Sequence, residues 1–403
     1  MRETKLTLKN VVLGLQHLVA MSGATILVPL VTGLNASVAL FTAGVGTLIF
    51  HLFTKGKVPV FLGSSFAFIG VISSIGQRYG MEYATGGIVV AGLVYLLFAL
   101  IVKLIGPERV KRLFPPVVTG SMIMVIGLTL APVVINSNIL EAAAGTVGQR
   151  WLVAFCVAAT MVIVSIFVKG FFQLTPILFG FLVGYIVSLA LGLVDTAAIA
   201  GAAWFQIPPF ILPKFNLEAI ISISSVTIVT FMEHIGDITT NGAVTGNDFF
   251  KDPGLPRTLI GDGLATTFAG LVGGPANTTY SENTGVLAMT GNFNPFTLEL
   301  AAVFAIILAF FGKLGVILQT IPAPVIGGAS IILFGMISSI GLRTVKDGNV
   351  DLNRSRNLII ISIMLVLGIS GVTLPITGTI GLSGLSLSAL TGIILNLVLP
   401  DSN

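Results

Sequence analysis

Three acidic residues in apolar surroundings are the side chains of this sequence best placed to do chemistry. Glu233 and Asp237 lie in "VTIVTFMEHIGDITT", and Glu282 lies in "GGPANTTYSENTGVLAMTG", residues 273–291. A carboxylate at membrane depth is costly unless it serves a substrate or a proton pathway. No Lys or Arg lies in the middle of an apolar segment, where it could neutralise these acids. A functional role is therefore favoured over a structural ion pair.

The spacing of Glu233 and Asp237 places both carboxylates on one face of a helix. Because like charges so close disfavour each other, we expect at least one of them to hold a proton near neutral pH. A proton-coupled carrier needs such a group. His234 points about 100° away around the same helix, so we expect it to pack or to support the acids rather than to touch a ligand.

Glu282 belongs to a different kind of pattern, a polar run in the middle of an apolar region. Every residue from Asn277 to Thr284 is polar. An acid at a helix start is favoured by the helix dipole alone, but it can also accept ligand N–H groups while nearby backbone N–H groups donate to ligand carbonyls. A flat, neutral ring with alternating N–H and C=O groups would fit. Phe66 and Tyr280 could stack on such a ring, although plain packing explains each equally well.

The composition requires a membrane to position these residues. The chain has 403 residues, of which 55% are hydrophobic and only 9% charged, with a mean hydropathy of +1.03. Soluble domains carry about 25% charged residues, and one hydrocarbon crossing takes about 20 apolar ones. The pattern predicts an all-α polytopic membrane protein. Its fourteen candidate spans lie near 10–32, 37–54, 58–77, 84–105, 115–134, 151–168, 173–194, 217–239, 258–272, 276–290, 298–318, 322–341, 357–372 and 381–399.

The basic residues orient these spans. With a cytoplasmic N-terminus, four of the 20 Lys and Arg residues fall outside and the other sixteen inside. The four outside are Arg78, Arg150, Lys214 and Lys313. Such a bias is typical of a plasma-membrane protein with both termini in the cytoplasm. The charged start "MRETKLTLKN" shows no small-residue cleavage site, so no removable signal peptide is expected.

The two halves of the chain share a plan. Residues 116–127, "PVVTGSMIMVIG", and residues 324–335, "PVIGGASIILFG", agree at five of twelve positions with an offset of 208. They belong to the fifth and twelfth spans. Because seven is an odd number, the second copy crosses the bilayer in the opposite direction, which predicts a seven-plus-seven inverted repeat.

The third and tenth spans are both interrupted. The third opens "VPVFLGSSFAFIG", and the tenth opens at Gly273 with Gly-Gly-Pro before the polar run. Irregular backbone at membrane depth is tolerated only inside the protein or along a cavity, and paired breaks in two halves point to a transporter's binding site. We expect the two extended segments to meet near the midplane, each leading into a half-helix.

These motifs resemble the nucleobase–ascorbate transporter family and, within it, the bacterial uracil permeases. "ENTGVLAMTG" (282–291) fits the family signature of Gln, Glu or Pro, then Asn-x-Gly, four residues, Thr, and Arg, Lys or Gly. "LQHLVAM", "GSSFAFI", "MEHIGD" and "NTTYSENTGV" are similar to uracil-permease blocks in the same order, and the likeness covers essentially the whole chain. It implies a core domain (10–105 and 217–318) moving against a gate domain (115–194 and 322–400).

By position, the resemblance implies a substrate site. Glu233 and Glu282 match the carboxylates that hold the base, Phe66 and Ser281 match positions whose backbone N–H groups meet its carbonyls, and Tyr280 matches a pocket position. The resemblance further implies a homodimer in membrane lipid, no cofactor beyond the coupling H+, and no nucleic-acid partner. Residues expected to couple protons or to support the site are Asp237, His234, His17, Asn283 and Phe334.

Two departures from the uracil-permease pattern bear on the substrate. Asp237 stands where the best-known uracil permeases carry a histidine, as in purine-type members, and Phe334 stands where a tyrosine can occur. Glu282, in place of the Gln of xanthine and urate carriers, points back to a pyrimidine. The expected substrate is uracil, with xanthine or another purine second. His17, the first-span histidine, either orients a neighbour or is a satisfied buried histidine.

Other classes fit less well. An anion transporter of the sulfate-permease type, which resembles this family in fold, would need a cationic residue at the half-helix starts, where this chain has carboxylates. An intramembrane hydrolase would need a catalytic dyad, and neither HExxH nor GxGD occurs. A passive channel would use similar polar breaks, and accumulation against a gradient separates it from a carrier.

Overall fold

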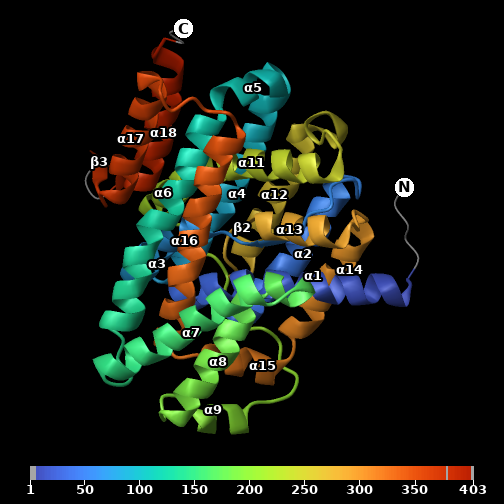
Figure 1. The fold of residues 1–403 in the computed structure, drawn as a ribbon, viewed down its shortest axis with the longest axis vertical. Helices are drawn as coiled ribbons and strands as arrows, with labels where there is room; N and C mark the ends of the chain where they lie inside the picture. The colour runs from blue at the N-terminus through green and yellow to red at the C-terminus, as the bar shows by residue number, and fades with distance from the viewer. Residues whose placement is uncertain (1–5, 378–379, 401–403) are drawn as a thin grey trace.

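Helices make up most of the computed structural model, which describes residues 6–377 and 380–400 (Figure 1). Each of the fourteen predicted spans coincides with a helix, with two consecutive helices, or with a short strand followed by a half-helix. The first half of the chain contains α1 (Leu8–Thr32), α2 (Ala36–Phe53), β1 (Leu62–Ser64), η1 (Phe66–Phe68), α3 (Ile69–Tyr79), α4 (Met81–Ile105), α5 (Pro107–Leu113), α6 (Pro116–Ile135), η2 (Asn136–Leu140), α7 (Val147–Phe167), η3 (Gly170–Leu174), α8 (Pro176–Ala190) and α9 (Thr196–Gly201).

The second half repeats this order with the same kind of break in its third span. It contains α10 (Leu217–Ser225), α11 (Thr227–Thr245), η4 (Phe250–Gly254), α12 (Leu255–Leu271), β2 (Asn277–Thr279), α13 (Ser281–Thr290), α14 (Pro295–Ala309), α15 (Gly312–Gln319), α16 (Ala323–Asp347), α17 (Ser355–Ile369), β3 (Thr373–Thr377), β4 (Ile380–Ser383) and α18 (Gly384–Val398). β1 therefore corresponds to β2, α3 to α13 and α6 to α16.

Two predicted spans differ from the structure. The segment 298–318 was expected to be continuous but forms α14 and α15, because Phe310 and Gly312 make backbone hydrogen bonds to Gln206 and Trp204 instead of continuing the helix. The eighth span divides at Val226 into α10 and α11 and continues to Thr245. The β3–β4 hairpin between α17 and α18 was not predicted either.

The helices pack in two groups. The first helix group, α1, α2, α4 and α10 to α14, is joined by contacts of α12 with α4 and α2, and of α14 with α1 and α2. The second helix group, α6 to α8 and α16 to α18, is joined by contacts of α6 with α16 and α17, and of α7 with α8 and α16. Figure 1 shows α6 beside α16, and α17 beside α18.

Glycines in α6 and α16 permit close packing in the second helix group. A Cβ atom on Gly341 would lie 2.5 Å from the carbonyl oxygen of Gly120, so only glycines let α6 and α16 approach so closely. Gly328, the counterpart of Gly120 in the repeat, lies equally close to Ala154 of α7. The repeated sequence is thus used to bring backbones together, as small residues commonly do between membrane helices.

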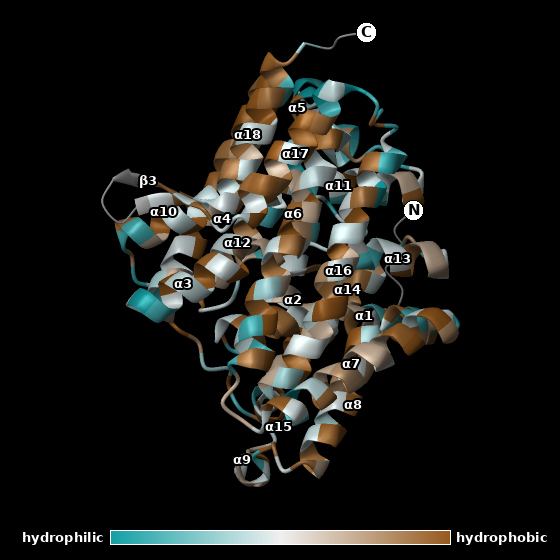
Figure 2. Ribbon diagram, turned by 60° about the vertical axis from the view of Figure 1, so that its left-hand side comes forward, coloured by the Kyte–Doolittle hydropathy of each residue, from teal (hydrophilic) through white to brown (hydrophobic). Residues whose placement is uncertain are grey.

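The outer surface of the bundle suits lipid. Figure 2 shows hydrophobic residues along most helices and hydrophilic ones gathered at helix ends and loops. Seven described helices are long and apolar enough to cross a membrane, and four shorter apolar ones accompany them. Side chains such as Leu97, Phe155 and Ile166 are exposed on the outside of these helices. The chain is an integral membrane protein, with α5 at one end and α9 and α15 at the other (Figure 1).

Candidate functional site

The two broken spans meet, as their sequences predict. β1 and β2 form a two-stranded antiparallel sheet although they lie more than two hundred residues apart. The register pairs Leu62 with Thr279, Gly63 with Thr278 and Ser64 with Asn277. A further backbone hydrogen bond joins Ser65 N to Ala276 O at 2.8 Å. The pairing satisfies extended backbone that would be too costly to leave unpaired inside a membrane protein.

Neighbouring helices hold this pair of strands through side-chain hydrogen bonds. In β1, the backbone N–H of Leu62 donates to the hydroxyl of Thr47 in α2 at 2.9 Å. In β2, the hydroxyl of Thr266 in α12 donates to the carbonyl of Asn277 at 2.9 Å. The amide of Asn277 donates to the carbonyl of Thr42 at 3.0 Å. Both strands are therefore fixed to the first helix group.

A helix begins directly after each strand. Phe66 opens η1, which continues into α3, and Ser281 opens α13. The residues before them, Ser65 and Tyr280, make no side-chain capping hydrogen bond. Helix starts carry unsatisfied N–H groups that attract electronegative atoms. The side chain of Ser281 lies outside the described part of the structure, and its predicted role requires only its backbone N–H.

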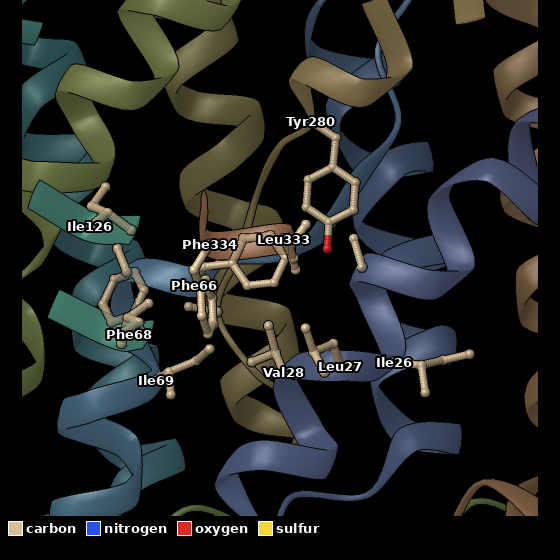
Figure 3. Close-up of a cluster of buried hydrophobic side chains, with 14 of the residues drawn as sticks. Ile26, Leu27, Val28, Phe66, Phe68, Ile69, Ile126, Tyr280, Leu333 and Phe334 are labelled. Carbon is tan, nitrogen blue, oxygen red and sulfur yellow. The ribbon is translucent and has the colours of Figure 1, made fainter. Parts of the chain in front are cut away.

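Three aromatic rings lie beside these helix starts (Figure 3). The rings of Phe66 and Tyr280 are parallel within 6°, with centroids 6.4 Å apart, and Phe334 of α16 meets Phe66 edge-on at 6.1 Å. The hydroxyl of Tyr280 donates to the carbonyl of Ser64 at 2.9 Å, which fixes the orientation of its ring. A Cβ atom on Gly63 would collide with that ring, so glycine is required there. The parallel rings could extend a stack onto a planar ligand.

The acids surround the same point. Asp237 is buried, and its Oδ2 accepts a hydrogen bond of 2.8 Å from the hydroxyl of Thr279 in β2. Glu233, half-buried one turn earlier in α11, lies within electrostatic range of Asp237, Glu282 and Asp262. Its Oε2 atom is buried and has no hydrogen-bond partner among the described residues. Glu282 lies in the first turn of α13. Both glutamates also lie within electrostatic range of Tyr280, so two carboxylates from different helices lie near its ring.

His234 turns away from this point, and it reveals an acid that was not among the predicted site residues. Its Nδ1 lies 2.7 Å from Oδ2 of Asp262, and its Nε2 lies 2.9 Å from the hydroxyl of Thr258. All three residues are fully buried. Asp262 is therefore a fourth acid inside a span, in addition to the predicted Glu233, Asp237 and Glu282. Asp262 falls within the predicted span 258–272. A charged residue between two glycines inside a predicted span is the sequence feature that could have identified it.

His17 of α1 and Asn283 of α13 lie close to each other beside the break. His17 of α1 is fully buried, and neither ring nitrogen has a well-aligned hydrogen bond within the described residues, although Asn283 is close enough to interact with it. The amide of Asn283 donates to the carbonyl of Pro59 at 3.0 Å, and the amide of Asn241 donates to the same carbonyl at 3.0 Å. This shared acceptor ties the start of the third span to α11 and α13.

The arrangement offers donors, acceptors and an apolar surface around one point. Backbone N–H groups at the starts of η1 and α13 can meet carbonyl oxygens, the carboxylates of Glu233 and Glu282 can accept N–H groups, and the rings of Phe66 and Tyr280 can cover a flat face. These are the features of a small-molecule site in which a few polar groups orient a ligand held by apolar walls.

Comparison with known proteins gives a consistent family. The family described as "Permease family" matches residues 8–377. The "Probable uracil permease" of Haemophilus influenzae is 45% identical over 400 residues, which cover 99% of this chain and 96% of that protein. The "Uracil permease" of Bacillus caldolyticus is 45% identical, with 97% of this chain and 92% of the relative covered. The "Uracil permease" of Escherichia coli K12 is 39% identical, with 97% and 91% covered.

Solved structures show the same fold at much lower identity. The transmembrane domain of the cyanobacterial bicarbonate transporter BicA aligns with a TM-score of 0.60 and 16% identity over 97% of each chain. The murine anion transporter Slc26a9 in the inward-facing state aligns with a TM-score of 0.71 and 11% identity, covering 99% of this chain and 69% of that one. At such identities the likeness extends to the fold alone.

Proposed function

Because this chain belongs to the nucleobase–ascorbate transporter family, we propose that it is a secondary-active importer of uracil that couples uptake to proton entry. The relatives that align over nearly its whole length are described as uracil permeases. The observation that carries the proposal is the β1–β2 pairing, which brings the starts of η1 and α13 to one point beside Glu233 and Glu282.

In the proposed complex, uracil lies across that point. The backbone N–H groups of Phe66 and Ser281 donate to its two carbonyl oxygens, and the carboxylates of Glu233 and Glu282 accept hydrogen bonds from its ring N–H groups. The ring stacks against Phe66 or Tyr280, whose planes are already parallel. Hydrogen bonds to charged groups contribute about 1.5–3 kcal/mol each, so the two acids would supply most of the discrimination against rings that lack those N–H groups.

The proton is proposed to bind Asp237 or Glu233. The two carboxylates are one turn apart, and Asp237 is bonded to the strand that leads into α13. Protonation on the outer side would relieve repulsion among the acids and allow the base to bind. Deprotonation on the cytoplasmic side would release it. His17 of α1 and Asn283 of α13 are proposed to hold neighbouring groups of this site in position. His234 is proposed to hold α11, which carries Glu233, against α12.

Transport is proposed to occur by alternating access. The core, 10–105 and 217–318, would contain the first helix group together with α3 and α15. The gate, 115–194 and 322–400, would contain the second helix group. Support comes from the density of contacts within each group. We further propose that the protein resides in the plasma membrane with both termini cytoplasmic, as the distribution of basic residues predicts, and that it forms a homodimer.

A purine such as xanthine is the second candidate substrate. Asp237 favours it, because this position is an acid rather than the histidine of the best-known uracil permeases. An anion substrate fits poorly although BicA and Slc26a9 share the fold, since residues 59–70 and 273–285 contain no Lys or Arg to attract a negative charge.

Uptake of labelled uracil by cells that lack their own carriers tests the proposal. We expect uptake to rise at acid external pH, to be abolished by a proton ionophore, and to be blocked by excess unlabelled uracil but not by xanthine or uric acid. Glu282→Gln should reduce uracil uptake at least tenfold, whereas the matched change Glu141→Gln, in an exposed loop, should have no effect. Uptake of xanthine in place of uracil would reject the pyrimidine assignment.

A further inference from the structure

The connection between the two repeats is unusually apolar for a loop. This linker segment, residues 202–216, runs from α9 to α10 and forms no helix and no strand beyond one isolated bridge at Phe205. Its sequence, "AAWFQIPPFILPKFN", contains a single charged residue, Lys214. A loop between transmembrane spans would ordinarily be polar if water surrounded it.

The apolar side chains of the linker segment point outward. Leu212 is 80% exposed and Phe205 and Ile207 are each 71% exposed, with Trp204 and Phe215 close behind. Single exposed apolar residues are common, but a continuous row of large ones marks a surface that contacts something other than water. These exposed residues lie along one stretch of chain, in which Pro208 is buried and Phe210 packs on Phe41, and together they are called the strip.

The backbone of the linker segment is hydrogen-bonded to α15 and to residues at the ends of α12 and α4 in the first helix group. The N–H of Gly312 donates to the carbonyl of Trp204 at 3.0 Å, and the N–H of Ile211 donates to the carbonyl of Val272 at 3.2 Å. The N–H of Lys214 donates to the carbonyl of Glu82 at 2.8 Å. Through these bonds the strip passes the start of α15, the end of α12 and the start of α4. All of these are span ends, where the bundle meets the membrane surface.

Two lysines beside the strip combine a charge with an aromatic ring. The Nζ of Lys313 lies 4.4 Å from the centre of the Trp204 ring. The Nζ of Lys214 lies 5.8 Å from the centre of the Tyr83 ring and 3.2 Å from Oε1 of Glu82. Trp, Tyr and Lys are the residues that gather at the boundary between lipid and water, because each has an apolar body and a polar end.

The backbone and the side chains of the linker segment together fit only one layer of the membrane. It cannot lie within the hydrocarbon, since an irregular backbone exposed to lipid has no partner for its N–H and C=O groups. Pro208, Pro209 and Pro213 prevent it from closing those groups in a helix. The headgroup layer supplies water and polar headgroups for the backbone and acyl chains for the side chains.

We propose that the linker segment lies in the headgroup layer at the α9 and α15 end of the molecule, with Trp204, Phe205, Ile207 and Leu212 inserted among phospholipids. The partner is the bilayer surface itself. Since the segment is bonded to the ends of α4, α12 and α15, it sets the depth of the helix group that carries Glu233 and Glu282. This position of the segment depends neither on the identity of the substrate nor on proton coupling.

Tryptophan fluorescence tests the position of the linker segment, because the chain has only two tryptophans, Trp151 and Trp204. The variant Trp151→Phe, reconstituted in phosphatidylcholine vesicles, reports Trp204 alone, and Trp204→Phe reports Trp151 of α7 as the matched control. Vesicles are prepared with bromine near the headgroup end or near the methyl end of the acyl chains, and iodide is added as an aqueous quencher. We expect loss of Trp204 emission mainly with bromine near the headgroups, and little loss with iodide.

Each other result overturns the proposal. Strong quenching by iodide without quenching by bromine would place the segment in water. Trp204 emission that neither iodide nor bromine quenches would mean that protein, such as a second copy of the chain, covers the linker segment. A second variant tests whether the apolar side chains hold the segment in the lipid. Phe205→Ser with Leu212→Ser, in the Trp151→Phe background, should shift Trp204 emission to longer wavelength and weaken its quenching by bromine. An unchanged helical circular-dichroism spectrum of the same samples shows that the fold survives, whichever substrate the protein takes.

Discussion

The hydroxyl of Thr279, in β2, donates a hydrogen bond of 2.8 Å to Oδ2 of Asp237, in α11. This bond links the break in the tenth span to the helix face that carries Glu233. We therefore expect a change in the charge of Asp237 to alter a hydrogen bond made by the strand that precedes Tyr280 and α13. No comparable side-chain bond joins β1 to an acid among the described residues, so the two breaks are not equivalent.

Asp237→Asn is expected to uncouple transport from the proton. The amide can still accept the hydrogen bond from Thr279, so the geometry should survive, but it cannot bind and release a proton. We expect exchange of labelled for unlabelled uracil across proteoliposomes to continue while accumulation driven by a pH gradient is lost.

Thr279→Val is the matched control for that experiment. It removes the donor and leaves the charge of Asp237, and an interhelical hydrogen bond in a membrane protein contributes only about 0.6 kcal/mol on average. Accumulation should therefore persist at a reduced rate. Proton-driven accumulation by Asp237→Asn at the original level would exclude Asp237 and leave Glu233 as the coupling residue.

The buried pair of His234 and Asp262 should stabilise the first helix group. Asp262→Asn and His234→Gln each remove one partner of a contact between α11 and α12. A buried hydrogen bond to a charged group contributes about 1.5–3 kcal/mol, so each variant should unfold at a lower temperature in detergent. The double variant should lose less than the sum of the two, because the second change removes a bond that the first has already broken. Strict additivity would show that the residues act independently.

Phe334 is expected to hold the ring of Phe66 in place. It is fully buried and meets that ring edge-on. Phe334→Ala would leave a cavity and cost about 3–5 kcal/mol of stability, and it would free Phe66 to rotate. Calorimetry should show weaker uracil binding as well as a lower unfolding temperature. Phe334→Tyr keeps the ring and serves as the control. Unchanged affinity in Phe334→Ala would show that Phe66 needs no support from α16.

Ser225 and Ser386 lie where the two helix groups touch. Their hydroxyl oxygens are 3.0 Å apart, one at the end of α10 and the other near the start of α18. Cysteines at both positions should form a disulfide, since side chains at this distance satisfy its short reach. If the groups separate during transport, oxidation should block uptake and a reductant should restore it.

A background of Cys156→Ser removes the chain's own cysteine, and the two single-cysteine variants are the controls for that cross-link. Uptake that continues at the same rate with the disulfide formed would mean that α10 and α18 stay together throughout the cycle.

Features that arise from local chemistry could be predicted from the amino-acid sequence. Hydropathy and charge located the spans because each must match the bilayer by its own composition. Pro59, Gly63 and Gly-Gly-Pro at 273–275 marked the breaks because Pro and Gly disfavour the interior of a helix, and the polar run from Asn277 marked a segment that lipid could not surround. The repeated glycines revealed the inverted halves. The split between α14 and α15 was not predicted, because it depends on hydrogen bonds with the distant residues Trp204 and Gln206.

Which groups act together depends instead on how the helices pack. The register of β1 on β2, the parallel rings of Phe66 and Tyr280, and the bond from Thr279 to Asp237 join segments that are far apart in the chain. Asp262 shows the reason most clearly. Its type and position were visible, but whether a membrane acid faces a ligand or a buried histidine depends on the neighbouring helix, and that neighbour is chosen by packing rather than by the residue itself.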